Sequence, residues 1–265
     1  MHKHHGVWEY VMNAEAHGNK AEAFRALHVP GRPLVAPNGW DAASAKIIER
    51  AGFPAVATSS AAVSACLGWE DGEAAPVEAM LATANGMARA VSVPVTVDFE
   101  RGYRLPPEDL VERLAATGAV GLNIEDSDPA TGVIVEISEQ VEFLRGVRGA
   151  AVAADLDLVI NARTDAFLRR VGTPAEQFAA SVERGNRYLD AGADCVYPLG
   201  TGEPATIEKL VQAIDGPVNV ARGVQSPLTL AELASLGVAR VTFGPSLQRH
   251  VYSWFEAEAL PGLLA

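Results

Sequence analysis

The stretch VTVDFERGYRLPPEDLVERLAATGAVGLNIED, residues 95–126, contains a complete strand–helix–strand unit. Val95–Asp98 is a run of strand-forming residues that ends in a carboxylate, and Gly121–Glu125 is a second apolar run that ends in the same way. Between them, residues 106–118 begin with prolines and acidic residues and end at a glycine, which is typical of a helix. Strands joined by a crossover helix lie parallel in one sheet, so this stretch predicts an α/β fold.

The same alternation of short strands and longer helical stretches continues along most of the chain. Several strands are continuous apolar runs, as expected for strands that are covered on both faces. The eight predicted strands are Leu34–Pro37, Ala55–Thr58, Val95–Asp98, Gly121–Glu125, Leu158–Ala162, Cys195–Pro198, Val218–Val220 and Arg240–Phe243. In a chain of 265 residues this number predicts a single-domain (β/α)8 TIM barrel, with a doubly wound open sheet as the alternative.

The chain is predicted to consist of an N-terminal extension, residues 1–22, and a barrel domain with a C-terminal helical segment, residues 23–265. The extension contains His2, His4 and His5. These could form a metal site, but we interpret them as part of a solvated tail because chain ends are usually loose. The C-terminal segment, residues 250–265, is rich in large apolar residues. It is predicted either to pack against its own barrel or to contact another subunit.

Composition and charge exclude several classes of function. The formal net charge of −12 argues against a nucleic acid or an anionic membrane surface as the main partner, because both attract basic surfaces. A small anionic substrate remains compatible, because a local cation can override the global field. The two cysteines, Cys66 and Cys195, cannot form a disulfide framework or a zinc site, and we interpret both as inert core thiols. With neither a membrane-spanning apolar run nor a signal peptide, the protein is expected in the cytoplasm.

Carboxylates gather where three consecutive predicted strands end. Asp98 and Glu100 project to the same side of an extended chain, and burying two like charges raises the pKa of both, so a bound cation is the simplest explanation. The next strands end in Glu125 and Arg163. Oxygen ligands without His or Cys suit Mg²⁺ or Mn²⁺, and an arginine can hold a substrate carboxylate with two hydrogen bonds. The alternative is that these groups are only strand-end caps and loop ion pairs.

Polar residues also follow the other predicted strands. Trp40 and Asp41 come after the first strand, Ser59 and Ser60 after the second, and Asn219 lies in the seventh. In an α/β barrel, residues at the carboxyl ends of the strands line the active site. We therefore expect these residues to bind a small, oxygen-rich, dianionic substrate between the metal ion and the arginine.

Five stretches of the chain match a known family in order and spacing. They are residues 37–73, VTVDFERGY (95–103), GAVGLNIEDS (118–127), INARTDAF (160–167) and YLDAGADCVYPLG (188–200). From about residue 24 to residue 250 the chain resembles the isocitrate lyase and phosphoenolpyruvate mutase superfamily. The resemblance implies a Mg²⁺-dependent (β/α)8 barrel that makes or breaks a C–C or P–C bond next to a 2-oxo acid through an enolate. It also implies tetramers whose subunits exchange a C-terminal helix.

The resemblance also implies roles for individual residues. Those that look like carboxylates of the metal sphere, partly through water, are Asp98, Glu100 and Glu125, with Asp71 as a further acid. Ser59 and Ser60 correspond to the turn that holds the carboxylate of the oxo acid, and Arg163 corresponds to the substrate arginine. With the metal ion as Lewis acid, Arg163 and backbone N–H groups would stabilise the enolate.

The loop after Glu125 departs from the best-known members of the superfamily. Isocitrate and methylisocitrate lyases carry a Lys-(Lys/Arg)-Cys-Gly-His motif there, but residues 125–140 contain no cysteine, lysine or histidine. Phosphoenolpyruvate mutases have a lysine where this chain has Ser127. The acid/base group is therefore open, with Tyr103, Asp126, Asp165 and a metal-bound water as unranked candidates, whereas His28 and His250 are interpreted as structural.

Three functions remain after this comparison. The first is a Mg²⁺-dependent lyase or decarboxylase that breaks a C–C bond next to a 2-oxo or 2-hydroxy carboxylate. The second is a phosphonate enzyme, either a phosphoenolpyruvate mutase or a phosphonopyruvate hydrolase. The third is a non-catalytic protein that binds a 2-oxo acid. Turnover of oxaloacetate against phosphonopyruvate separates the first two, and saturable binding without turnover indicates the third.

Overall fold

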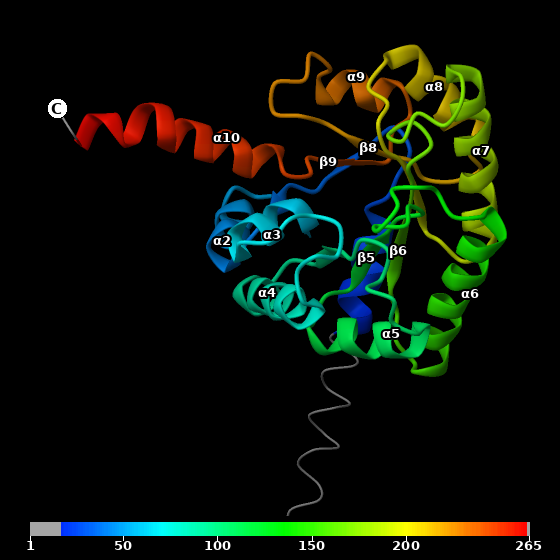
Figure 1. The fold of residues 1–265 in the computed structure, drawn as a ribbon, viewed down its shortest axis with the longest axis horizontal. Helices are drawn as coiled ribbons and strands as arrows, with labels where there is room; N and C mark the ends of the chain where they lie inside the picture. The colour runs from blue at the N-terminus through cyan, green and yellow to red at the C-terminus, as the bar shows by residue number, and fades with distance from the viewer. Residues whose placement is uncertain (1–16, 264–265) are drawn as a thin grey trace, which may run out of the picture.

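The computed structural model describes residues 17–263, which form a ring of parallel strands surrounded by helices (Figure 1). The strands of this part of the chain are β1 (Leu34–Val35), β2 (Asn38–Gly39), β3 (Val56–Thr58), β4 (Val95–Asp98), β5 (Gly121–Ile124), β6 (Val159–Thr164), β7 (Cys195–Pro198), β8 (Asn219–Ala221) and β9 (Arg240–Thr242). They pair in two sheets, β2-β3-β4-β5-β6-β7 and β1-β9-β8, and all pairs of neighbours are parallel.

The two sheets are joined into one barrel at two places. A parallel bridge between Val196 and Val218 links β7 to the start of β8. At the other place the chain itself passes from β1, which pairs with β9, to β2, which pairs with β3. Asn38 reinforces this place, because its Oδ1 accepts from the backbone N–H groups of Phe243 and Gly244 while its Nδ2 donates to the carbonyl of Thr58. The predicted barrel is confirmed, with its ring of backbone hydrogen bonds interrupted at these two places.

Strand boundaries follow the sequence closely, with one split. Val95–Asp98 and Cys195–Pro198 are strands as predicted. The predicted strand Leu34–Pro37 is instead two short strands, because Pro37 has no N–H to donate and the chain changes partners there.

The helices lie around the outside of the ring (Figure 1). They are α2 (Ala42–Arg50), α3 (Ser60–Leu67), α4 (Val77–Ala90), α5 (Pro107–Ala116), α6 (Ile137–Ala153), α7 (Pro174–Asp190), α8 (Pro204–Ala213), α9 (Leu230–Ser235) and α10 (Ser246–Trp254). Their starts are set by local sequence: Thr173 and Thr229, for example, form capping boxes with Glu176 and Glu232. Each long helix buries one apolar face against the sheet.

The inside of the barrel is polar, whereas the layer between strands and helices is apolar. Asn161 donates to Asn123 Oδ1 at 2.7 Å across the interior, and the fully buried Arg240 reaches the same oxygen at 3.4 Å. The apolar layer is formed by residues such as Leu122, Leu144 and Ile160, all fully buried. Burial of this layer stabilises the fold, and the polar interior is left for the site at one end of the barrel.

A helix over residues 17–26 packs against the barrel opposite the carboxyl ends of the strands. Ala21 and Phe24 are fully buried, and Arg25 forms ion pairs with Asp157 and Asp194. This helix runs across residue 22, where the sequence placed the end of an N-terminal extension, and that domain boundary stays a prediction. His2, His4 and His5 lie outside the described residues.

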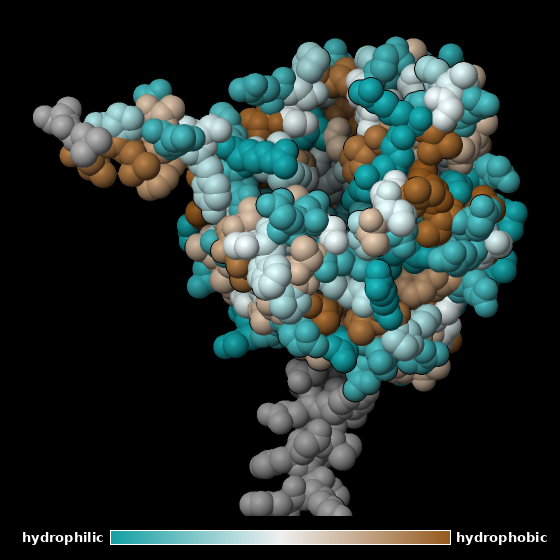
Figure 2. Space-filling model, viewed as in Figure 1, coloured by the Kyte–Doolittle hydropathy of each residue, from teal (hydrophilic) through white to brown (hydrophobic). Residues whose placement is uncertain are grey.

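The C-terminal helix α10 projects from the barrel (Figure 1). Apolar side chains gather along it and the turns that follow (Figure 2), and the exposed ones are Val251, Tyr252, Trp254, Phe255, Leu260 and Leu263. The segment therefore does not pack along its length on its own barrel, which was the first of the two predicted outcomes. The second, contact with another subunit, stays a prediction. Within residues 17–263, no helix combines the length and the apolar character needed to cross a membrane.

Candidate active site

Three neighbouring strands bring the predicted carboxylates and the arginine to one end of the barrel. β4 ends at Asp98, Glu125 directly follows β5, and Arg163 lies near the end of β6. In the sheet Asp98 pairs with Asn123, and Asn123 pairs with Asn161, so Glu125 and Arg163 lie two residues beyond that level. Alternate side chains of a strand share a face, which is why all of these residues point into the barrel.

Asp98 is held by the N-terminus of α3. The backbone N–H and the hydroxyl of Ser60 both donate to Asp98 Oδ2 at 2.9 Å. The partial positive charge of a helix N-terminus favours a carboxylate at this place. Ser59 is the N-cap of α3, and its hydroxyl accepts from the backbone N–H of Ala62 at 3.4 Å. Both serines were predicted to bind substrate, and here their hydroxyls have protein partners instead.

Both carboxylate oxygens of Glu100 already have hydrogen-bond partners. Oε2 accepts from the backbone N–H groups of Gly72 at 2.8 Å and Glu73 at 2.6 Å, and Oε1 accepts from the hydroxyl of Tyr103 at 2.5 Å. Burial, with a contribution from the charges of Asp71 and Asp98, raises the pKa of Glu100 to about 7. The pKa of Tyr103 is raised far above its usual value by burial and by Glu100, so this phenol donates a hydrogen bond but is a weak acid.

Arg163 does not present a free fork to a substrate. Its Nε and Nη2 donate to the two oxygens of Asp165 at 2.6 and 2.9 Å, and its Nη1 lies 2.5 Å from Glu125 Oε2. Arg163 therefore links two carboxylates. The expectation that Arg163 holds a substrate carboxylate with two hydrogen bonds stays a prediction, and such a carboxylate would bind beside these contacts or in place of Glu125.

The surroundings of Glu125 disfavour its ionisation. It is 7% exposed, and burial raises its pKa to about 8 although Arg163 acts in the opposite direction; Asp165, Asp98 and Glu100 add repulsion. Asp71 is exposed at the rim, yet burial of its carboxyl group and repulsion by Asp98 raise its pKa as well. The structure thus gathers Asp71, Asp98, Glu100 and Glu125 as the sequence predicted.

The donor set fits a hard cation bound mainly through water. Among residues 17–263, no three His, Cys, Asp or Glu side chains are arranged to ligate one ion directly. Glu100 has both oxygens hydrogen-bonded, whereas Asp98 Oδ1 and Glu125 Oε1 have no hydrogen-bond partner among residues 17–263. Mg²⁺ usually keeps several waters and takes one or two carboxylates directly. Burial and repulsion by neighbouring carboxylates raise the pKa values of Glu100 and Glu125, and a bound cation would lower both.

Three residues expected at the substrate have other contacts. The side chain of Asp41 caps α2 by accepting from the backbone N–H of Ser44 at 2.6 Å. Trp40 packs edge-on against Tyr252 of α10, with ring centroids 6.3 Å apart. Asn219 is fully buried at the start of β8, where its amide pairs with the hydroxyl of Thr242 at 3.3 Å. Asn219 lies inside the barrel as the first residue of β8, and this strand begins one position later than predicted.

A second layer of side chains supports Arg163 from behind. The fully buried Asp126 accepts from the backbone N–H of Asp165 at 2.9 Å, and also from Tyr188 at 2.8 Å and Arg184 at 3.2 Å, both on α7. Burial raises the pKa of Asp126 even though Arg184 opposes the shift. Asp126 is therefore engaged in fixing the β6 end, which argues against it as a free acid/base group.

The loop after Asp126 is a short closed turn. Ser127 bridges to Ile134, and Asp128 Oδ1 accepts from the backbone N–H groups of Ala130 and Thr131 at 2.9 and 2.8 Å. Ser127 is fully buried and donates to Asp165 at 2.7 Å. The residue that stands in place of a lysine in the mutases therefore supports Asp165.

One of the two cysteines was interpreted wrongly. Cys195 is buried in β7, where burial raises its pKa to about 12, as expected of an inert thiol. Cys66 is exposed near the end of α3, and it lies on the face of this helix that is turned toward α10 and not toward the barrel. Its sulfur lies 3.3 Å from the hydroxyl of Tyr252 and accepts from Gln248 at 3.1 Å.

Sequence reasoning missed Glu73, which joins the loop after α3 to the loop after β4. Its Oε1 accepts from the backbone N–H groups of Tyr103 at 2.6 Å and Arg101 at 3.1 Å. Glu73, Glu100 and Tyr103 have φ of 59°, 48° and 54°, in the left-handed region that is unfavourable for residues with a Cβ. Such strain is typical of functional sites. The signal in the sequence was a second acid two residues after Asp71.

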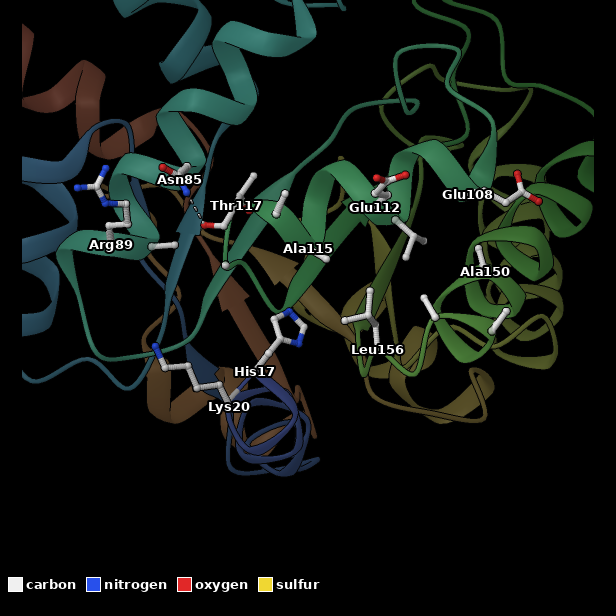
Figure 3. Close-up of a pocket in the computed structure, with 16 residues that line it drawn as sticks. His17, Lys20, Asn85, Arg89, Glu108, Glu112, Ala115, Thr117, Ala150 and Leu156 are labelled. Atoms are coloured by element: carbon white, nitrogen blue, oxygen red, sulfur yellow. Dashed lines mark hydrogen bonds between the residues drawn. The ribbon is translucent and has the colours of Figure 1, made fainter. Parts of the chain in front are cut away.

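A groove lies away from these carboxylates, between the helix over residues 17–26 and helices α4, α5 and α6. Its volume is about 930 Å³. Figure 3 shows His17 and Lys20 at one end and Glu108 and Glu112 at the other, with small apolar side chains such as Ala115 between them. The groove is formed by helix faces, which do not carry the strand-end groups, so we do not place the chemistry there.

The fold and the site define an α/β-barrel protein with a cluster of carboxylates and an arginine at the carboxyl ends of β4, β5 and β6. The family model for phosphoenolpyruvate phosphomutase matches residues 24–261. The chain therefore belongs to the phosphoenolpyruvate mutase family, within the superfamily that also contains isocitrate lyases, as the sequence motifs predicted.

Individual relatives carry different activities. The 2-methylisocitrate lyase of Escherichia coli K12 is 30% identical over 258 residues, which is 89% of this chain and 84% of that protein. A solved structure from Burkholderia cenocepacia J2315, provisionally assigned as a phosphonomutase, is 40% identical with a TM-score of 0.85 and covers 90% of this chain and 98% of its own.

Two further solved structures share the fold at lower identity. Oxaloacetate acetylhydrolase in complex with the product oxalate is 23% identical, with a TM-score of 0.79, over 92% of this chain and 88% of its own. Phosphonopyruvate hydrolase in complex with oxalate and Mg²⁺ is 24% identical, with a TM-score of 0.75, and the match covers 91% of this chain and 88% of that one. At this level of identity the two likenesses show that the fold is shared.

Proposed function

We propose that this protein is a Mg²⁺-dependent lyase or decarboxylase that breaks a C–C bond next to a 2-oxo or 2-hydroxy carboxylate, with Mn²⁺ as an alternative metal. The observation that carries the proposal is the cluster of Asp98, Glu100 and Glu125, in which Glu125 contacts the guanidinium of Arg163. Three acids beside one cation leave excess negative charge in a buried place, and a divalent cation with its waters would compensate it.

The residues of the chain would bind the substrate and stabilise charge. When bound, the metal ion supplies Lewis-acid stabilisation of an enolate oxygen. Arg163, fixed on one side by Asp165, directs its Nη1 toward Glu125 and so toward the open part of the site. The N-terminus of α3 at Ser60 adds a second positive pole next to Asp98. Both are preorganised, which is the property that makes such groups effective in catalysis.

The absence of a thiol and an imidazole after Glu125 favours reactions that need no protein base. Residues 125–140 contain neither Cys nor His. The three side chains considered as acid/base candidates, Tyr103, Asp126 and Asp165, are all hydrogen-bonded to other groups. Decarboxylation or cleavage of an oxaloacetate-type diacid needs the least from an acid/base group. The E. coli relative is named as a 2-methylisocitrate lyase, and this relationship supports a lyase activity here.

A steady-state comparison of substrates tests this proposal. With saturating Mg²⁺ we expect kcat/KM to be higher for oxaloacetate than for phosphonopyruvate, and to be lost when EDTA removes the metal. Arg163→Lys keeps the charge but not the paired geometry, and loss of one such donor typically costs about 10²–10³-fold in kcat. Thermal unfolding of the variant checks that it folds. Faster turnover of phosphonopyruvate would show that the protein is a phosphonate enzyme instead. Saturable oxalate binding without turnover of any acid would show that it is a non-catalytic binding protein.

A phosphonate enzyme is the second candidate because of the likeness to the provisionally assigned phosphonomutase, at 40% identity. The structure offers one specific argument against it. Ser127 stands where the mutases are expected to have a lysine, and its hydroxyl is used to hold Asp165 rather than facing open space. A phosphoryl group bound here would therefore lack the positively charged lysine that a mutase site is expected to provide.

A further inference from the structure

Two loops at the mouth of the barrel hold each other through a reciprocal pair of carboxylates. Glu100, in the loop after β4, accepts from the backbone N–H groups of Gly72 and Glu73 at 2.8 and 2.6 Å. Glu73, in the loop between α3 and α4, accepts in return from the backbone N–H groups of Arg101 and Tyr103 at 3.1 and 2.6 Å. Each glutamate therefore binds the backbone of the loop that carries the other one.

The backbone of both loops is shaped for this arrangement. Gly72 and Glu73 have φ of 94° and 59°, and Gly102 and Tyr103 have φ of 96° and 54°. Left-handed residues of this kind turn neighbouring N–H groups toward a common centre, which creates a small anion-binding nest. In this protein the anion in each nest is a glutamate of the opposite loop.

The pairing decides where Asp71 lies. Asp71 directly precedes Gly72, and its carboxyl group interacts with Ser60 and with the charge of Asp98. The segment 68–76 begins at Gly68, the C-cap of α3. The two contacts of Glu100 and the two of Glu73 join the loop that carries the rim acid to the loop after β4.

We propose that Glu73 is a positioning residue that fixes the loop 68–76 against the loop 99–104 and thereby places Asp71 beside the metal-binding carboxylates. Glu73 acts through its oxygen as an acceptor of two backbone hydrogen bonds, and it is not itself a metal ligand. The effect on metal binding rests on the function proposed above, whereas the effect on the loops does not.

Three variants separate an acceptor from a charge. Glu73→Gln keeps an oxygen that can accept the two N–H groups, Glu73→Ala removes it, and Glu70→Ala serves as control because Glu70 is an exposed residue of the same loop. Hydrogen exchange of the metal-free protein is followed by mass spectrometry on peptides that cover residues 69–77 and 99–105. We expect exchange in both peptides to be at least roughly tenfold faster in Glu73→Ala, with Glu73→Gln and Glu70→Ala close to the parent protein.

Calorimetry with Mn²⁺ alone gives the second measurement. Loss of a group that orients metal ligands typically lowers metal affinity about 10–100-fold, and we expect this of Glu73→Ala but not of Glu73→Gln. A parent protein that fails to bind Mn²⁺ would contradict the proposed function, while the exchange result would still decide the role of Glu73.

Two outcomes would overturn the proposal. Unchanged exchange in Glu73→Ala would show that the loops are held by other contacts. Equal loss of Mn²⁺ affinity in Glu73→Gln and Glu73→Ala, with normal exchange in both, would show that the charge of Glu73 acts on the metal ion directly.

Discussion

Glu100 and Glu125 illustrate how single residues carry the electrostatics of the site. Both are almost fully buried, and burial combined with neighbouring carboxylates makes their ionised forms unfavourable. Residues that were built only for stability would more simply be apolar here, because removing a charge from water costs free energy. The cation of the proposed function would explain their presence, because it would lower the pKa of each acid and turn repulsion into attraction.

The stability of the metal-free protein should fall as the pH rises from about 6.5 to about 8. Burial raises the pKa of Glu100 to about 7 and that of Glu125 to about 8 from an ordinary 4.5, so in this range the folded chain binds more protons than the unfolded chain. The free energy of unfolding then decreases with pH, by roughly 1–2 kcal/mol over the range. His28, whose pKa burial lowers to about 4 from 6.5, has the opposite effect, but only at lower pH.

Urea unfolding in EDTA at several pH values measures this dependence. Glu125→Gln is the control, because it removes one of the two titrating groups and should flatten the slope. Mg²⁺ should stabilise the parent protein more at the upper end of the range, since binding requires deprotonated carboxylates. A free energy of unfolding that rises with pH across the range would contradict the assignment of raised pKa values.

At the scale of elements, α7 supports the site from outside the barrel. Tyr188 and Arg184 reach from this helix to Asp126, which in turn holds the backbone of Asp165. Tyr188→Phe should lower the free energy of unfolding by about 1.5–3 kcal/mol, because it removes a hydrogen bond to a buried carboxylate. Tyr252→Phe on α10 is the matched control, with an expected change within about 0.5 kcal/mol. Equal values for the two variants in urea unfolding would argue against the supporting role of α7.

The closed turn after β5 predicts which substrates are slow. The turn is closed by local hydrogen bonds around Asp128, and residues 125–140 contain no thiol or imidazole. The protein therefore lacks the acid/base group that the lyase motif provides for isocitrate and 2-methylisocitrate. General acid/base catalysis typically contributes about 10²–10⁴-fold. We expect kcat/KM for isocitrate to be lower than for oxaloacetate by about this factor. Isocitrate cleavage as fast as that of oxaloacetate would show that another residue replaces the cysteine.

At the scale of the whole molecule, α10 predicts an oligomer. Trp254 is 57% exposed, Phe255 50% and Leu260 42%, on a helix that projects from the barrel. An apolar surface of this kind is expected to be covered by a second copy of the chain. Light scattering at micromolar concentration should show a dimer or tetramer, and Trp254→Asp combined with Phe255→Asp should reduce its mass. A monomer in the parent protein would contradict the prediction, and His250→Ala, at an exposed position of the same helix, is the control.

The sequence by itself determined the barrel, the family and the end of the barrel at which the acidic residues gather. Each of these follows from local information: the apolar runs, the helix starts and the acidic strand ends all lie within short stretches, and parallel strands must present their carboxyl ends at one face. Asp98, Glu100 and Glu125 could therefore be brought together without knowledge of any contact.

Only the tertiary structure decided which of these groups are free to act. The fork of Arg163 is held by Asp165, the side chain of Asp41 caps α2, and Asn219 lies inside the barrel, although all three were expected at the substrate. Glu73 was missed because its partners are backbone N–H groups of a loop 28 to 30 residues away. Hydrogen-bond partners at such separations depend on how loops meet in space, and no periodicity of side chains along the chain records them.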